Sequence, residues 1–250
     1  NVELYLAEVQ ATTYDDQAQF SPNGELPTKD TSGGKWGYAK ITAFTNSTTV
    51  TADVLSDFGS TSASAKYREG AWSTKRGFPR TVLFHEQRLV WAATDNNPQT
   101  LWFSESAEYE THTPGAKDSD PIVYTIAAND VNVIRWLSSS SKTMLVGTLG
   151  GEFKIAGSKD GPLTSSNIAA TPETGYGSSK TAPIRIGSPT LFIQKSGRKL
   201  RELAFNFDTD SFRAPDLSQL AESLFPKKVS IIYMDYQQDE DPILWCVRSD

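Results

Sequence analysis

Apolar and polar residues alternate along much of this chain, and the alternation is clearest between residues 77 and 115. Two strand-like runs, Thr81 to Phe84 and Arg88 to Thr94, flank His85-Glu86-Gln87, and a third, Thr100 to Ser104, follows a polar loop. A period of two residues is typical of a half-buried antiparallel sheet. The segment is therefore expected to form a hairpin with a third strand.

This hairpin unit recurs three times downstream. The copies run through Ile134 to Ala156, Ile184 to Phe205 and Val229 to Arg248, and their starts near residues 80, 134, 183 and 229 are 54, 49 and 46 residues apart. Propeller blades repeat every ~40–50 residues. The spacing thus favours a partial β-propeller, with a β-sandwich, whose strands recur every ~8–12 residues, as the alternative. Because the chain starts and stops beside strand-like runs, we expect it to be part of a longer polypeptide.

A change in composition predicts a boundary near residue 66. Residues 12–35 are polar, whereas Trp36 to Phe44 and Thr48 to Leu55 alternate as the two arms of a hairpin. We expect a small β module at residues 1–66 and a propeller-like domain at residues 67–250. One short helix is predicted at Pro215 to Phe225, where leucines and alanine recur at helical spacing.

Composition narrows the classes of function. Thirty acidic and twenty-four basic residues give the 250-residue chain a net charge of −6, so a broad electropositive surface for nucleic acid is not expected. Cys246 is the only cysteine in the sequence, which excludes an intramolecular disulfide. It lies in an apolar run, which favours a buried thiol. No run approaches the ~18 apolar residues of a membrane helix, so no membrane segment is expected.

The two histidines, His85 and His112, lie 27 residues apart, and neither belongs to a recognisable ligand pair. His85 could be a general base, but its place between two strand-like runs favours an exposed turn residue. The G-x-S-x-G, Walker A, H-E-x-x-H and EF-hand spacings are absent. We therefore expect no catalytic residues, no metal site and no cofactor.

Carboxylates supply the enzymatic alternative, because two of them suffice for glycoside hydrolysis. Asp208 and Asp210 follow a strand-like run that would point both to one side, although a turn stabilised by Asx side chains is favoured. The acidic cluster Asp239 to Asp241 likewise predicts a solvated hairpin loop. Ser158 to Gly161 departs from the Asp-box turn of sialidases, because its glycine comes one place early and the aromatic residue is missing.

Aromatic and basic side chains offer two binding alternatives. Three tryptophans could stack on sugar rings: Trp36, Trp72 and Trp102. In alternating strands, however, such residues more often belong to the core. Four basic residues could contact phosphate: Lys195, Arg198, Lys199 and Arg201. Their tight turn, followed at once by Glu202, favours a solvated face or a subunit contact.

Many short strings, in order, resemble one family. They cover about residues 36 to 250: Arg68–Ser73, Gly77–Arg80, Phe84–Leu89, Asn97–Ser104, Tyr109–Glu110, Asn132–Leu137, Leu145–Glu152, Gly161–Thr164, Gly197–Leu203, Arg213–Leu217 and Leu244–Arg248. These strings resemble the tail tubular protein B, or nozzle, family of short-tailed bacteriophages. Residues 1–35 resemble no family that we can name.

The resemblance implies a structural protein of the virion, assembled in the host cytoplasm, with propeller-like β modules. It also implies a homohexameric ring below the tail adaptor protein, with DNA passing through the central channel without specific binding and tail fibres at the flank. No catalytic residues are implied. An acidic chain suits this role, because a channel that bound phosphates would hold back the DNA. A glycan-binding or polysaccharide-degrading tail protein is the alternative.

Overall fold

The computed structural model describes residues 5–11, 35–46, 49–56, 67–69, 71–72, 76–112, 114, 117–128, 132–140, 143–157 and 161–250. Over these residues the fold is all-β, as the alternating pattern predicted. The strands pair antiparallel in five sheets, four of which contain four strands each. The described part of the chain contains no helix of seven residues or more.

The N-terminal sheet has the strand order β3-β2-β1-β4. Its members are β1 (Tyr5–Ala11), β2 (Lys35–Asn46), β3 (Thr49–Ser56) and β4 (Tyr67–Glu69). The pairing of β2 with β3 confirms the hairpin predicted at residues 36–55. Because β4 pairs with β1, this sheet takes in residues up to Glu69, while the division into domains at residue 66 stays a prediction.

Three further sheets are four-stranded meanders in which each strand pairs with its neighbours in sequence. The first sheet contains β5 (Thr81–His85), β6 (Arg88–Ala92), β7 (Thr100–Phe103) and β8 (Ile122–Thr125). The second contains β9 (Ile134–Ser140), β10 (Thr143–Thr148), β11 (Glu152–Gly157) and β12 (Ile168–Thr174). The third contains β13 (Ile184–Arg185), β14 (Thr190–Ile193), β15 (Leu200–Asn206) and β16 (Ser211–Arg213).

The repeated hairpins predicted from the sequence are therefore present, but each of these sheets has a fourth strand that the prediction missed. The missed strands are β8, β12 and β16. Each is short or lacks a run of large apolar residues, so its pairing comes from the neighbouring strand and not from its own pattern. A blade of four antiparallel strands is the unit of a β-propeller.

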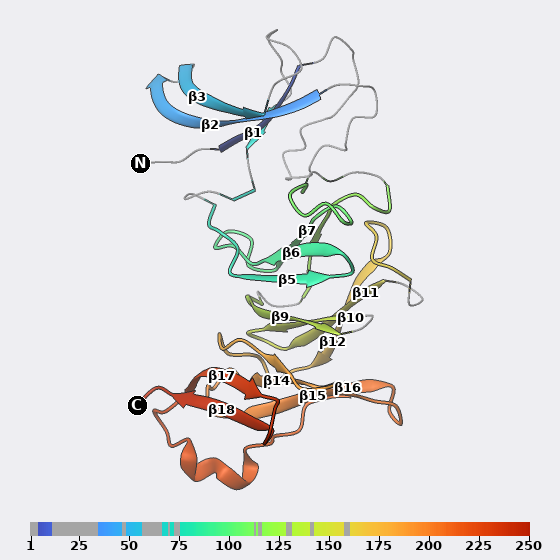
Figure 1. Cartoon of the computed structure of the whole chain (residues 1–250), viewed down its shortest axis with the longest axis vertical. Helices are drawn as coiled ribbons and strands as arrows, with labels where there is room; N and C mark the ends of the chain where they lie inside the picture. Colours follow the sequence, from blue (N-terminus) through green and yellow to red (C-terminus); the bar gives the residue numbers. More distant parts are fainter. Residues whose placement is uncertain are drawn as a thin grey trace.

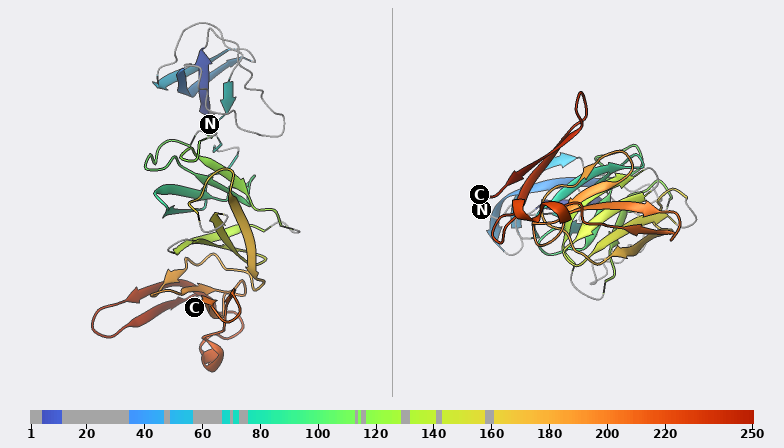
Figure 2. Two further views of the ribbon diagram at one scale, coloured as in Figure 1. Left: turned by 90° about the vertical axis from the view of Figure 1, so that its right-hand side faces the viewer. Right: turned by 90° about the horizontal axis from the view of Figure 1, so that it is seen from below.

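The meanders are stacked along the longest axis of the molecule, as Figure 1 and the left view of Figure 2 show. Side chains from the first and second sheets form one core cluster, and those from the second and third form another. In β10, Met144 and Val146 join the first cluster, whereas Leu145 joins the second with Phe192 of β14. Alternate residues of one strand therefore pack on opposite neighbours, which explains why the middle strands are apolar at consecutive positions.

The chain ends in a two-stranded hairpin formed by β17 (Ile231–Gln237) and β18 (Ile243–Arg248). Only its inner face packs on the third sheet, through Ile231 and Met234 against Ile193. The helix predicted before it is wrong in extent, because only a kinked 3₁₀ segment, Gln219–Leu224, forms. Leu220 of this segment is fully exposed, so it does not belong to the buried stripe that a longer helix would require.

Candidate functional site

The outer face of the first sheet carries a row of apolar and aromatic side chains. Val82, Trp91, Trp102 and Val123 lie directly opposite one another on successive strands. Trp72 covers this row edge-on, with ring centroids 5.5 Å from Trp91 and 5.8 Å from Trp102. The prediction that these aromatics belong to a packed core is confirmed for Trp102, which is buried.

The third candidate tryptophan, Trp36, is a residue of β2, where it pairs with Gln10, and its side chain lies outside what the structure describes. The aromatic cluster on the first sheet includes one of the two histidines. The ring of His112 meets that of Trp72 edge-on, with the centroids 5.8 Å apart. Burial lowers the pKa of His112, because desolvation disfavours the charged ring among these aromatic side chains.

His85 is not an exposed turn residue, and that prediction was wrong. It is the last residue of β5 and only 3% exposed. Its Nδ1 lies 2.8 Å from the Ser139 hydroxyl of the next sheet, and desolvation lowers its pKa below 6.5. The turn itself is formed by Glu86 and Gln87, both with positive φ (46° and 59°), which is the geometry of a tight type I′ hairpin.

The carboxylate of Glu86 reaches across to the second sheet, where it accepts a hydrogen bond of 2.8 Å from the amide of Leu163. With the His85–Ser139 contact, this bond links the first β-hairpin to the sheet below it. The side chains at this hairpin therefore hold two sheets together. These contacts give a structural role to His85 and Glu86, the two polar residues that the sequence placed at a hairpin tip.

Arg88 and Glu152 are buried charged residues that were not singled out from the sequence. Arg88 is 3% exposed and donates to four main-chain carbonyls, those of Ser104, Ser119, Asp120 and Asp118. A guanidinium can satisfy several carbonyls at once because its donors are fixed in a plane. Arg88 therefore closes the long connection between β7 and β8.

Glu152 of β11 is the second such residue, and it is fully buried. Burial raises the pKa of its carboxyl, while hydrogen bonds from Thr174, Ser178 and two main-chain amides favour the ionised form. No basic side chain is among these partners. The carboxyl anchors the segment that leads from β12 to the third sheet, which is a structural role that no sequence motif would reveal.

The basic residues predicted to form a solvated face or a subunit contact do not act alike, and a solvated face is wrong for Arg201. Arg201 is buried, lies 3.5 Å from the centroid of the Tyr176 ring and donates to Gln194. Arg198 donates to a main-chain carbonyl of residue 225, and Lys199 pairs with Asp216 at 2.9 Å. Of the four, Lys195 remains exposed.

The acidic candidates lie where the turn prediction placed them. Asp208 and Asp210 are exposed at the tip of the β15–β16 hairpin. The side chain of Asn206 accepts hydrogen bonds from the amides of Asp208 and Thr209, so a neighbouring amide residue supplies the Asx turn. Asp239 to Asp241 are exposed at the tip of the last hairpin. Most of Ser158 to Gly161 lies outside the described residues.

An open pocket of about 570 Å³ lies beside the β15–β16 hairpin, against the segment that follows β12. Its lining combines aromatic and polar side chains: Tyr176, Phe205 and Phe212 with Glu202, Asn206 and Arg213. Phe205 and Phe212 meet edge-on with centroids 5.4 Å apart. Rings beside carboxylate, amide and guanidinium groups are the surroundings in which a sugar can both stack and hydrogen-bond.

The remaining candidates carry little chemistry. Cys246 is half-buried against the last core cluster, and burial raises the pKa of its thiol, which makes it a poor nucleophile. Among the described residues, no three His, Cys, Asp or Glu side chains gather closely enough to hold a metal ion. The same residues include no helix with the length and apolar content needed to cross a membrane.

No protein-family model matches the chain, and no curated protein matches it.

Proposed function

We propose that this chain is a structural component of a short-tailed bacteriophage tail. In this role six copies form a ring below the adaptor protein, DNA leaves through its central channel, and the ring's flank supports tail fibres. The observation that carries the proposal is the ordered series of strings, from Arg68–Ser73 to Leu244–Arg248, that resembles the tail tubular protein B family. Their positions on repeated antiparallel units agree with a protein whose role is shape and assembly.

Charge and fold support the same proposal. The net charge of −6 leaves no broad attraction for phosphate, as a channel that must release DNA requires. Three successive four-stranded meanders have the strand number and order of propeller blades. We include a propeller-like arrangement in the proposal, with neighbouring copies covering the exposed sheet edges.

Electron microscopy of the protein, alone and with the adaptor protein, tests this function. Six-fold rings, and their attachment to the adaptor, are expected. Monomers in both samples would contradict the proposal. A band-shift assay with double-stranded DNA should show no binding at physiological salt, and tight binding would contradict a passive channel.

Glycan binding is the second candidate, and the pocket lined by Tyr176 and Phe205 favours it. In that case Phe205→Ala should abolish binding to host polysaccharide, because a stacking surface is lost. Asp208→Asn with Asp210→Asn tests cleavage separately, since both carboxylates lie at the exposed hairpin tip. Absence of binding and of cleavage on host polysaccharide would remove this candidate.

A further inference from the structure

A second open pocket, of about 330 Å³, lies where the third sheet meets the base of the β17–β18 hairpin. Its lining carries two lysines, Lys180 and Lys195, and no carboxylate. Both lysines are exposed, and neither forms an ion pair within the described part of the chain. Ser196 and Ser230 line the same pocket. Two unpaired ammonium groups beside hydroxyls suit a carboxylate-bearing ligand.

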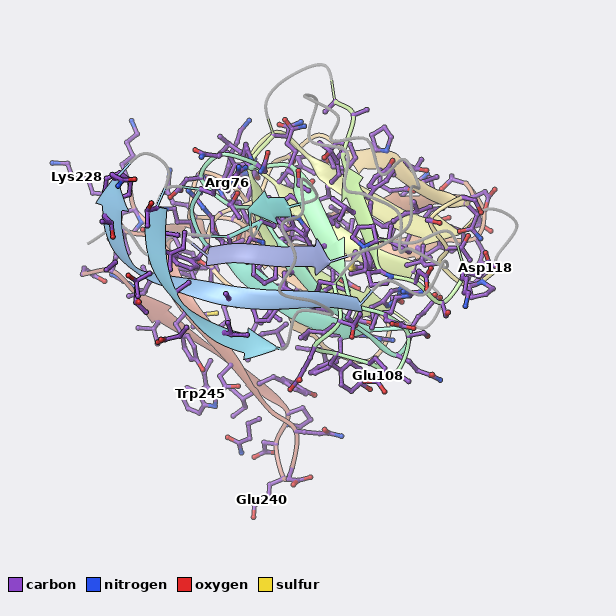
Figure 3. The ribbon with its side chains drawn as sticks, turned by 90° about the horizontal axis from the view of Figure 1, so that it is seen from above. Arg76, Glu108, Asp118, Lys228, Glu240 and Trp245 are labelled. Carbon is purple, nitrogen blue, oxygen red and sulfur yellow. The ribbon has the colours of Figure 1, made fainter. Side chains whose placement is uncertain are left out.

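The complementary charge lies at the far end of the same hairpin. Asp239, Glu240 and Asp241 are exposed and, in the described part of the chain, make no ion pair. Figure 3 shows Lys228, just before the hairpin, and Glu240, at its tip, at opposite ends, with the tip directed away from the body. The hairpin thus joins a positive base to a negative tip.

The tip cannot reach the pocket of its own chain. Ile231 lines the pocket and Asp239 stands at the tip, and eight residues of extended strand span about 25 Å at ~3.3 Å per residue. Contact between the two charges therefore requires a second molecule. Because tip and pocket are different surfaces, such a contact is head-to-tail, the kind that closes into rings when the rotation permits.

The face of the hairpin between base and tip supplies apolar area for the same contact. Tyr233 lies opposite Val247, and Asp235 lies opposite Trp245. Tyr233, Trp245 and Val247 are 56%, 56% and 48% exposed. An exposed apolar strand pair of this kind marks an interaction surface.

We propose that the acidic tip of one copy's β17–β18 hairpin docks in the Lys180–Lys195 pocket of a second copy, with the outer face of the hairpin covered by the contact. The inference rests on the proposed ring and adds its contact residues. Each copy donates one tip and receives one, so the same pair of charges repeats around the assembly. Ion pairs flanking an apolar strip fix the register of the contact as well as its strength.

Charge reversal on each side of the contact, followed by mixing of the two variants, tests the pairing of tip and pocket. Lys180→Glu with Lys195→Glu, and separately Asp239→Lys with Asp241→Lys, should each weaken self-association about 10-fold or more in sedimentation velocity over a concentration series. Mixing the two variants restores association, because opposite charges then face each other at every contact of an alternating assembly. Lys117→Glu, an exposed lysine outside the pocket lining, is the matched control and should associate like the wild type.

The possible outcomes distinguish failure of this contact from failure of the proposed ring. A wild type that never associates overturns the proposed ring and this contact together. A wild type that forms rings unaffected by both reversals overturns only the contact. Loss of association by the lysine reversal alone assigns the pocket to another acidic surface and overturns the tip as its occupant.

Cross-linking remains decisive if a charge variant misfolds. Ser196→Cys with Glu240→Cys, in a Cys246→Ser background, should give oxidised dimers and higher ladders on a non-reducing gel. The distance of about 25 Å between base and tip excludes an intramolecular disulfide. Each single-cysteine variant should stay monomeric on the gel, and absence of ladders from the double variant in a sample that forms rings overturns the contact.

Discussion

The second sheet and the final hairpin contain strands of similar apolar content that differ in what covers them. In β10 every residue after the first is buried, with Met144 and Leu145 facing opposite core clusters. In β18 no residue is fully buried, and Trp245 is 56% exposed. The difference teaches that an apolar run predicts a strand, whereas its role as core or as contact surface depends on the neighbouring sheet.

The packing of Trp136 shows how closely the inner sheets fit. Its ring, 1% exposed, lies between the second and third sheets with its centroid 5.5 Å from that of Phe192. A Cβ atom at Gly147, on the adjacent strand, would overlap the Trp136 ring. Glycine at residue 147 is therefore required by close approach.

Replacing tryptophan by alanine in each region should give the largest contrast. Trp136→Ala should lower the free energy of unfolding by about 3–5 kcal/mol, because a large cavity opens between two sheets. Trp245→Ala should cost less than about 1 kcal/mol in the monomer, since half of its surface is already in water. Urea unfolding of both variants measures the difference, and equal losses would show that the last hairpin is packed like the inner sheets.

Replacing Glu152, the buried carboxyl of the second sheet, should change how the stability of the protein depends on pH. Its folded-state pKa is raised above 4.5, so the stability associated with the protonated carboxyl is present below pH 4.5 and is lost as pH rises through the folded pKa. Wild type should therefore lose stability relative to Glu152→Gln across that window, by at most about 1.4 kcal/mol per pH unit.

Urea midpoints of the two proteins between pH 4 and pH 8 measure this slope. Glu108→Gln, at an exposed carboxylate, is the control and should parallel the wild type. Parallel curves for Glu152→Gln would show that the Glu152 carboxyl titrates as it does in the unfolded chain.

His85 should give a smaller effect in the opposite direction. Burial lowers its folded-state pKa below 6.5, so the unfolded chain takes up the proton first and the native state is destabilised as pH falls below 6.5. In His85→Gln this part of the acid sensitivity should disappear. Thermal melts at pH 7.5 and pH 5.5 measure it, with His112→Gln as a separate variant because its pKa is also lowered. Unchanged acid sensitivity in His85→Gln would contradict the buried position.

Substitutions at the exposed tip of the β15–β16 hairpin should have the smallest effect on the free energy of unfolding. Asp208→Asn and Asp210→Asn should each change the free energy of unfolding by no more than about 0.5 kcal/mol, since both residues are exposed. At Asp210, where φ is +46°, asparagine suits the left-handed backbone at least as well as aspartate. A loss above about 2 kcal/mol in chemical unfolding would place these side chains in a contact that their exposure does not indicate.

Much of the fold could be predicted because each long strand carries its own signal. The period-two pattern located the hairpins of all the repeated units, and the tight turn expected within Lys195 to Arg201 is present at Gly197, whose φ is +76°. The strands β8, β12 and β16 were missed, because short or weakly apolar segments acquire their conformation by pairing with a neighbour. The length of the helix at Pro215 to Phe225 was overestimated, since helical spacing does not stabilise a long helix when Leu217 and Leu220 are left exposed.

Individual side chains were harder to predict than strands. His85 and Arg201 are both buried against residues far along the chain. His85 contacts Ser139, and Arg201 lies over the ring of Tyr176. Glu152 carries no motif, and its partners come from the segment after β12. Such contacts are decided by which sheets stack, and local pattern contains no information about that.

The sequence by itself determined an all-β chain of repeated hairpins with a net negative charge, because strand periodicity, turn residues and charge are local properties. Only the tertiary structure decided which apolar faces became core and which stayed open, because burial depends on the stacking of one sheet on the next. Met144 and Trp245 are comparable in sequence, each a large apolar residue in a strand. A covering sheet makes Met144 part of the core. In the described structure no sheet covers Trp245, which leaves it available for contact with another molecule.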